Sequence, residues 1–224
     1  MVLTLTACGD LMRPRPEPPP AMVTLGSDIQ AGDIRERLAF WTEDVTNCEA
    51  MLNLGDVRFV RVADRADSEV CRIEDAGSLT SDGGVRSSLS PGGPVMTCPL
   101  AAAVSLWRRQ SVEPAARELL GAEVEAIEHF GVYACRNIYG REDARPSAHA
   151  TAEAMDIAAF RLSDGRQISV LGDWQPDGPE ARFLRRVRDD ACRLFGVVLS
   201  PDYNAAHRDH LHLELHDNRW SLCR

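Results

Sequence analysis

Apolar residues recur at helical spacing in three parts of the chain, residues 33–52, 98–121 and 179–196. In the last of these, one side of the predicted helix collects the apolar residues Phe183, Leu184, Val187, Ala191, Leu194 and Phe195. Pro114 and Gly121 are placed to begin and end a helix within the second segment. These patterns predict helices that each bury one face.

Other segments alternate like strands. Residues 56–64 and 123–136 do so, and residues 154–172 form the clearest hairpin, with a turn at Asp164-Gly165. Residues 197–215 predict a strand, a loop and a final strand. Residues 74–95 are rich in Gly, Ser and Asp and are predicted as a loop. The order predicts a single α+β domain, with a mostly antiparallel sheet flanked by helices.

The N-terminal 24 residues differ from the rest of the chain. "RPRPEPPPAM", residues 13–22, predicts an extended spacer, and a globular domain is expected over residues 25–224. "LTAC", residues 5–8, has the form of a bacterial lipobox, in which Cys8 would be lipidated if the natural chain starts further upstream. A chance Leu-Thr-Ala-Cys is the alternative. The first interpretation predicts an exported, periplasmic protein whose only membrane contact is a lipid anchor.

Composition narrows the function. A net charge of −9 argues against phosphate-mediated nucleic-acid binding. All 25 basic residues are arginine, which excludes a lysine nucleophile or Schiff base. Cys8 is the odd member of seven cysteines; export would allow disulfides among the other six, with 15 possible pairings left open. No apolar run is long enough to span a membrane.

"HRDHLHLELH", residues 207–216, holds four of the six histidines. In a strand, His210, His212, Glu214 and His216 would share one face, while the leucines between them point into the core. That face could bind a metal, or it could belong to a solvated edge strand.

A second group lies in "SAHATAEAMD", residues 147–156, which contains His149 and Asp156. By itself it could be a small-residue loop with an incidental histidine. With His212, however, the two residues make a two-histidine, one-carboxylate set, a common catalytic zinc arrangement. Asp209 and His210, close to His212 in the sequence, are both candidates for the general base.

These motifs carry a resemblance. Ser-x-His, six residues and Asp, followed downstream by Asp-x-x-His and His-x-His, resembles the zinc superfamily of D-Ala-D-Ala carboxypeptidases, murein endopeptidases and the Hedgehog signalling domain. Within it, the chain resembles the bacterial extensin-like C-terminal domain family over roughly residues 45–224. The matching stretches are "CPLAAAVSLW", "GVYACRN", "SAHATAEAMDIAAFRLSDGRQISV", "FLRRVRDDACRLFG" and "PDYNAAHRDHLHLEL".

The resemblance implies a Hedgehog- or DD-peptidase-like fold in which Zn²⁺ is held by His149, Asp156 and His212. Phage L-Ala–D-Glu endolysins belong to the same superfamily, and their pattern would make Asp209 the general base. The murein-endopeptidase pattern, His-x-x-His-x-His, falls on His207, His210 and His212 and would make His210 the catalytic residue. Arg136 would grip a substrate carboxylate, and Ser147 and His207 would also lie at the substrate site. The chain departs from the superfamily in two places: its usual glycine between the histidine and the aspartate is Ala152, and Cys135 stands beside Arg136.

The expected function is therefore zinc-dependent hydrolysis of peptide or amide bonds, with peptidoglycan stem peptides as the substrate. Water activated by the zinc would attack the carbonyl carbon. Three alternatives stay open. The domain could keep zinc but only bind the cell wall or a partner, as an envelope lipoprotein; the histidines could acquire metal; or the protein could be a disulfide-stapled structural component.

Overall fold

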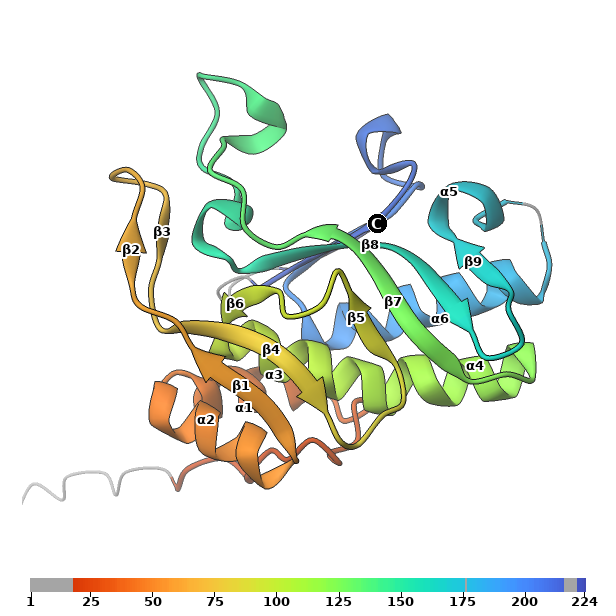
Figure 1. Ribbon diagram of the computed structural model, residues 1–224, viewed down its shortest axis with the longest axis horizontal. Helices are drawn as coiled ribbons and strands as arrows, with labels where there is room; N and C mark the ends of the chain where they lie inside the picture. The colour runs from red at the N-terminus through yellow and green to blue at the C-terminus, as the bar shows by residue number, and fades with distance from the viewer. Residues whose placement is uncertain (1–17, 176, 216–220) are drawn as a thin grey trace, which may run out of the picture.

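The computed structural model describes residues 18–175, 177–215 and 221–224. These residues form one α+β domain, as predicted (Figure 1). The α-helices are α1 (Ile34–Thr42), α2 (Val45–Leu54), α3 (Cys98–Trp107), α4 (Glu113–Leu120), α5 (Val170–Asp173) and α6 (Pro179–Leu194). A π-helical stretch, η1 (Arg108–Val112), joins α3 to α4, and short 3₁₀ turns follow at η2 (Ile138–Gly140), η3 (Ala148–Thr151) and η4 (Ala205–His207).

The larger sheet has the strand order β12–β10–β11–β8–β7–β5, and β9 also pairs with β8. Its strands are β5 (Ser88–Ser90), β7 (Val124–Gly131), β8 (Ala154–Leu162), β9 (Gln167–Ser169), β10 (Val197–Leu199), β11 (Leu211–Glu214) and β12 (Leu222–Cys223). All pairs are antiparallel except β5 with β7 and β10 with β12. The mostly antiparallel sheet was predicted from the sequence, and so was the β8–β9 hairpin, whose turn places Gly165 at φ +87°.

A second sheet contradicts the predicted loop at residues 74–95. It has the order β1 (Val57–Arg61), β4 (Ala76–Asp82) and β6 (Val95–Thr97), so the predicted loop contains β4 and also β5. The small residues there reflect close packing: a Cβ on Gly77 would lie 2.7 Å from the Phe59 ring and 2.8 Å from the Val60 carbonyl oxygen. Composition alone does not distinguish such a strand from a loop. A separate two-stranded hairpin joins β2 (Arg65–Ala66) to β3 (Arg72–Ile73).

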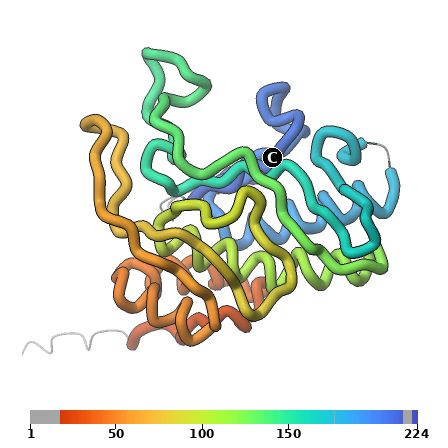
Figure 2. Tube along the Cα trace, in the orientation of Figure 1, coloured from red at the N-terminus to blue at the C-terminus, as the bar shows by residue number. Residues whose placement is uncertain are grey.

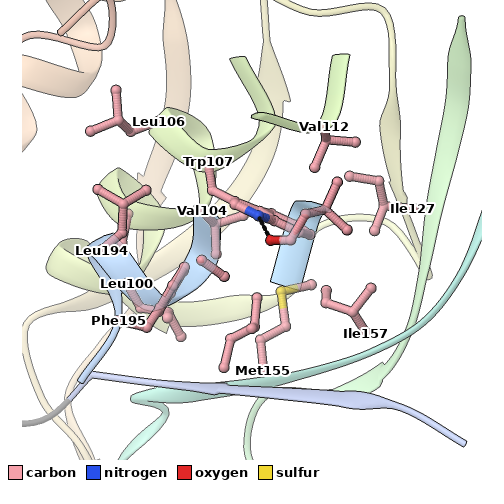
Figure 3. Packing of buried hydrophobic residues seen from close by; sticks show 14 of the residues in the cluster. Leu100, Val104, Leu106, Trp107, Val112, Ile127, Met155, Ile157, Leu194 and Phe195 are labelled. Atoms are coloured by element: carbon pink, nitrogen blue, oxygen red, sulfur yellow. Dashed lines mark hydrogen bonds between the residues drawn. The ribbon is translucent and has the colours of Figure 1, made fainter. Parts of the chain in front are cut away.

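Helices α3, α4 and α6 pack together below the large sheet and enclose the main core (Figures 1 and 2). The predicted face of α6 is buried throughout. Trp107 is fully buried, and its indole Nε1 donates a 2.9 Å hydrogen bond to the Val187 carbonyl oxygen (Figure 3). The predicted helix limits also hold, since Pro114 lies in the first turn of α4 and Gly121 ends it in the left-handed conformation. Each large apolar side chain buried here contributes about 1.5–3 kcal/mol.

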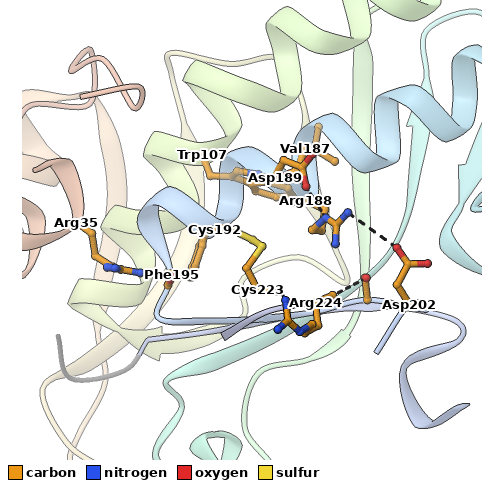
Figure 4. Close-up of a disulfide and its surroundings, with 11 residues drawn as sticks. Arg35, Trp107, Val187, Arg188, Asp189, Cys192, Phe195, Asp202, Cys223 and Arg224 are labelled. Atoms are coloured by element: carbon orange, nitrogen blue, oxygen red, sulfur yellow. Dashed lines mark hydrogen bonds and ion pairs between the residues drawn. A yellow bond between two sulfur atoms is a disulfide. The ribbon is translucent and has the colours of Figure 1, made fainter. Parts of the chain in front are cut away.

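Three disulfides join the six cysteines other than Cys8. Cys48–Cys98 links α2 to α3, and Cys71–Cys135 links the β2–β3 turn to the segment that follows β7. Cys192–Cys223 ties α6 to β12, where the Ser200 hydroxyl also donates to the Arg224 carbonyl (Figure 4). Such disulfides are typical of exported proteins.

Cys8 and the lipobox lie outside the described residues, as does His216. Among the described residues, no helix combines the length and the apolar character needed to cross a bilayer.

Candidate metal centre and its cleft

Strand pairing brings two of the predicted ligands together. β11 pairs with β8 so that His212 stands opposite Asp156, and the His212 Nδ1 lies 2.8 Å from the Asp156 Oδ1. On the other face of β11, Leu211 and Leu213 are fully buried, as the alternation predicts. Since β11 lies between β10 and β8, it is not an edge strand, and His212 is only 7% exposed. The solvated edge-strand interpretation is therefore wrong.

His149 reaches the same point from the turn η3. Its Nε2 lies 3.2 Å from the Asp156 Oδ2 and 3.3 Å from the His212 Nδ1. The turn is held by the Ser147 side chain, which accepts from the His149 backbone N–H, and it ends at Ala152 with φ +56°. That left-handed conformation favours glycine, and here Ala152 adopts it. One ligand atom from each of His149, Asp156 and His212 lies within 4.8 Å of the others. These three candidate ligands are called the metal-ligand cluster below.

The outward nitrogens of both histidines are hydrogen-bonded to oxygen acceptors. His149 Nδ1 lies 2.7 Å from the Val132 carbonyl oxygen, and His212 Nε2 lies 3.0 Å from the Glu214 carboxylate. Because each outward nitrogen must donate, the inward nitrogen of each neutral ring carries a lone pair. Metal-binding histidines generally have such an outer partner. Two imidazole nitrogens and one carboxylate, all converging, fit the donor preferences of Zn²⁺.

Electrostatics add to this fit. Burial would lower the pKa of His212, but hydrogen bonds and charge interactions with Asp156 and Glu214 outweigh it and raise that pKa to about 9. Burial would raise the pKa of Asp156, yet its contacts with His149 and His212 hold that pKa well below the usual range. Without a metal, the His212 imidazolium thus balances two partly buried carboxylates, Asp156 and Glu214, at neutral pH. A bound cation would take over that role.

The predicted substrate residues line one cleft of about 330 Å³ beside this cluster. Arg136, Ser147, His207 and His210 line the cleft together with Asp156 and His212. His149 lies behind the cleft surface and is 3% exposed. The structure thus brings all the predicted site residues except Cys8 into one region.

The two candidate bases form a pair. The His210 Nδ1 lies 2.9 Å from the Asp209 Oδ1, and the His210 Nε2 lies 3.7 Å from the Asp156 Oδ1. Asp209 is not among the residues that line the cleft, whereas His210 is. This places the His210 ring between Asp209 and the metal-ligand cluster, with its Nε2 toward the cluster.

His207 contributes a neutral ring to the cleft. Burial lowers its pKa to about 4, and repulsion from the protonated forms of His210 and His212 acts in the same direction. Its Nδ1 bonds the Asn204 side-chain oxygen, and the rings of Tyr139 and Tyr203 pack against it at centroid distances of 6.2 and 5.6 Å. A neutral His207 keeps positive charge in the cleft low.

Sequence reasoning missed several contributors. The strand pattern put Glu214 on the same face as His212 but assigned it no function. The His-x-Glu spacing in a strand could have indicated that Glu214 accepts a hydrogen bond from the His212 ring. The Val132 carbonyl is a backbone group and leaves no sequence signal. Arg145 also lines the cleft, where the Asn137–Pro146 bridge brings the loop back. Nothing in the local sequence distinguishes it from other surface arginines.

Comparison with known proteins gives one clear relationship. No curated protein and no solved structure matches the chain. A family model described as "Extensin-like protein C-terminus" matches residues 46–224, which is most of the chain and includes every residue of the metal-ligand cluster. The chain therefore belongs to the extensin-like family, whose C-terminal family model matches its residues 46–224.

Proposed function

We propose that this protein is a zinc-dependent hydrolase that cleaves peptide or amide bonds in peptidoglycan stem peptides. The observation that carries the proposal is that the His149–Asp156–His212 cluster opens on the same cleft as the His210–Asp209 pair. A ligand set with two oriented histidines and a nearby imidazole–carboxylate pair supplies the groups that metal-assisted hydrolysis uses: a metal site that activates water and a base that takes its proton.

Zn²⁺ bound by the three ligands would supply a Lewis acid that lowers the pKa of a coordinated water to around 7 and polarises a carbonyl group. The protein prepares for this by fixing the ligands from outside. Val132 and Glu214 hold the outward nitrogens of the two histidines, so both rings are oriented before a metal binds.

His210 is the group that we assign to proton transfer. Asp209 accepts from its Nδ1 and thereby leaves the Nε2 of the neutral ring free to take a proton on the cleft side. Of the two candidates, His210 is favoured because it lines the cleft and Asp209 does not. Asp209 then acts as a positioning residue. General base catalysis of this kind contributes about 10²–10⁴-fold to a rate.

Arg136 is the group that we assign to substrate binding. It is exposed, lines the cleft, and forms no ion pair within the described part of the chain. A planar guanidinium in that position can bind a substrate carboxylate through two parallel hydrogen bonds. The preceding residue is held by the Cys71–Cys135 disulfide, which restricts the backbone that carries Arg136.

The cellular setting is part of the proposal. The three disulfides support export, and a periplasmic position with a lipid at Cys8, spaced from the domain by the proline-rich segment, would place the cleft near the cell wall.

The test is metal content together with product release. The purified full chain is analysed for bound metal beside His149→Ala and Asp156→Ala, and the zinc-loaded wild type and His210→Ala are incubated with purified murein. We expect near-stoichiometric zinc that both ligand variants lose, and soluble fragments from the wild type alone. A chain that binds no zinc and releases no fragment would refute the proposal. Zinc and murein binding without any fragment would instead identify a non-catalytic wall-binding protein.

A further inference from the structure

The cleft at the metal-ligand cluster adjoins a second, larger hollow. This groove has a volume of about 940 Å³ and lies between α1 and the segment that runs from η2 through η3. The cleft and the groove share four lining residues: Ile138, Arg145, Ser147 and Glu214. Because these residues line both hollows, the cleft and the groove lie next to each other. The groove alone is close to the upper end of the volumes that hold a drug-sized ligand.

The charged side chains differ between the cleft and the α1 side of the groove. Arg136 lines the cleft and Arg145 stands at the junction; in the described part of the chain neither has an ion-pair partner. On the α1 side, the groove is lined by Glu36 and Glu43, both exposed and likewise without an ion pair among the described residues.

The other charged groups of the groove have partners. Arg35 donates to the Phe195 carbonyl oxygen, Glu153 accepts from the Thr151 hydroxyl, and Glu214 accepts from His212. The groups left to meet a ligand are therefore basic near the metal-ligand cluster and acidic at the α1 end. Phe40, 47% exposed, adds an apolar surface on the same side of the groove.

We infer that the cleft and groove together bind one extended zwitterionic peptide. Its carboxylate lies at Arg136 and Arg145, and a free amine further along lies against Glu36 and Glu43. The inference rests on the proposed function and names its substrate class: a stem peptide whose side-chain amine is free, not blocked by a cross-link. Arg145 and the two α1 glutamates become specificity-determining residues outside the metal-ligand cluster.

The experiment uses three soluble peptides of the sequence Ala-Glu-Lys-Ala-Ala with cell-wall stereochemistry and a γ-linked glutamate: unmodified, acetylated at the lysine amine, and amidated at the free α-carboxyl of the glutamate. Dissociation constants are measured by calorimetry on the zinc-loaded full chain carrying His210→Ala, which prevents turnover and leaves the metal ligands in place. The same background then receives Glu36→Gln with Glu43→Gln, or Arg145→Gln. Exposed residues outside both hollows, Glu125→Gln and Arg182→Gln, are the matched controls.

We expect acetylation to weaken binding about two- to fivefold, the range for exposed ion pairs, and to have no effect once Glu36 and Glu43 are replaced. Arg145→Gln should weaken binding of the unmodified peptide and reduce the penalty for amidation. Both controls should behave as the parent chain. A penalty for acetylation that survives the glutamate replacements would overturn the inference, because the amine would then be recognised elsewhere.

Turnover by the chain with His210 intact separates this inference from the proposed function. The predicted binding pattern without any hydrolysis would support the groove and contradict the hydrolase. Hydrolysis with a kcat/KM indifferent to acetylation and to the α1 variants would support the hydrolase and contradict the groove. If the peptides are neither bound nor cleaved, both are wrong.

Discussion

Glu214 offers a sharp test of how the protein prepares the metal-ligand cluster. Its carboxylate accepts from the His212 Nε2 at 3.0 Å, and its side chain is 17% exposed. Glu214→Gln keeps nearly the same shape and can still accept through its carbonyl, but it removes the charge. A hydrogen bond to a charged group contributes about 1.5–3 kcal/mol and a neutral one about 1 kcal/mol, so the loss is about 0.5–2 kcal/mol. Outer partners of metal-binding histidines affect metal affinity by about 10–100-fold.

The loss of zinc affinity caused by Glu214→Gln should depend on pH. His212 is faced by Asp156 from β8, by His149 from η3, by the ring of His207, and by Glu214, and its pKa in the metal-free chain is about 9. At pH 7 only about one His212 ring in 100 is neutral, so competition by the proton lowers the apparent affinity for zinc about 100-fold.

Replacing Glu214 has two opposing effects. It weakens the support for the bound ligand, and it also removes one of the two carboxylates that raise the His212 pKa, so the proton competes less. At pH 7 the weaker support for the ring and the weaker competition by the proton oppose each other. Above pH 9 the His212 ring is already neutral, so only the weaker support affects zinc binding. We expect the zinc dissociation constant of Glu214→Gln, relative to wild type, to rise several-fold at pH 7 and about tenfold or more at pH 9.5.

Competition with a chromogenic chelator at both pH values measures this, because the chelator's own pH dependence cancels in the ratio of variant to wild type. Glu125→Gln, an exposed residue on β7, is the control and should bind zinc as wild type does. An affinity ratio that is the same at both pH values, or no change in affinity at either, would refute the assigned role of Glu214.

The remaining predictions concern the base, the metal-free fold and the disulfide beside Arg136. Asp209→Asn and His210→Ala should each lower kcat on a stem peptide by about 10²-fold or more, and the double variant should be no worse than His210→Ala; a loss of bound zinc in the single variants would contradict the assignment. In the metal-free chain, the raised pKa of His212 stabilises the fold, and this contribution is fully present below the pKa of histidine in the unfolded chain, about 6.5. Urea unfolding should show that this stability is lost as pH rises through 9, whereas zinc-loaded protein should show no such loss. Replacing Cys71 and Cys135 together by Ala should reduce the free energy of unfolding by about 2–4 kcal/mol and raise KM, because Arg136 loses its brace; equal KM values would show that the disulfide is structural only.

Local sequence patterns predicted much of this fold because the elements concerned depend on residues close together in the chain. The buried face of α6, the β8–β9 turn at Gly165 and the end of α4 at Gly121 follow from side-chain periodicity and from the backbone freedom of glycine. The three candidate ligands were predicted from residue type and spacing, since imidazole and carboxylate groups limit the chemistry to a few kinds.

Tertiary structure decided what depends on distant residues. The strand β4 was mistaken for a loop because its glycine is required by contact with β1, which no local pattern records. The pairing of six cysteines, the register that sets His212 opposite Asp156, and the roles of Glu214 and Arg145 all arise from contacts between segments far apart in sequence. The sequence by itself determined which elements form and which residues can bind a metal. The long-range contacts determined where those residues meet, how their protons are held, and that a groove along α1 adjoins the cleft, because each of these depends on how distant segments pack.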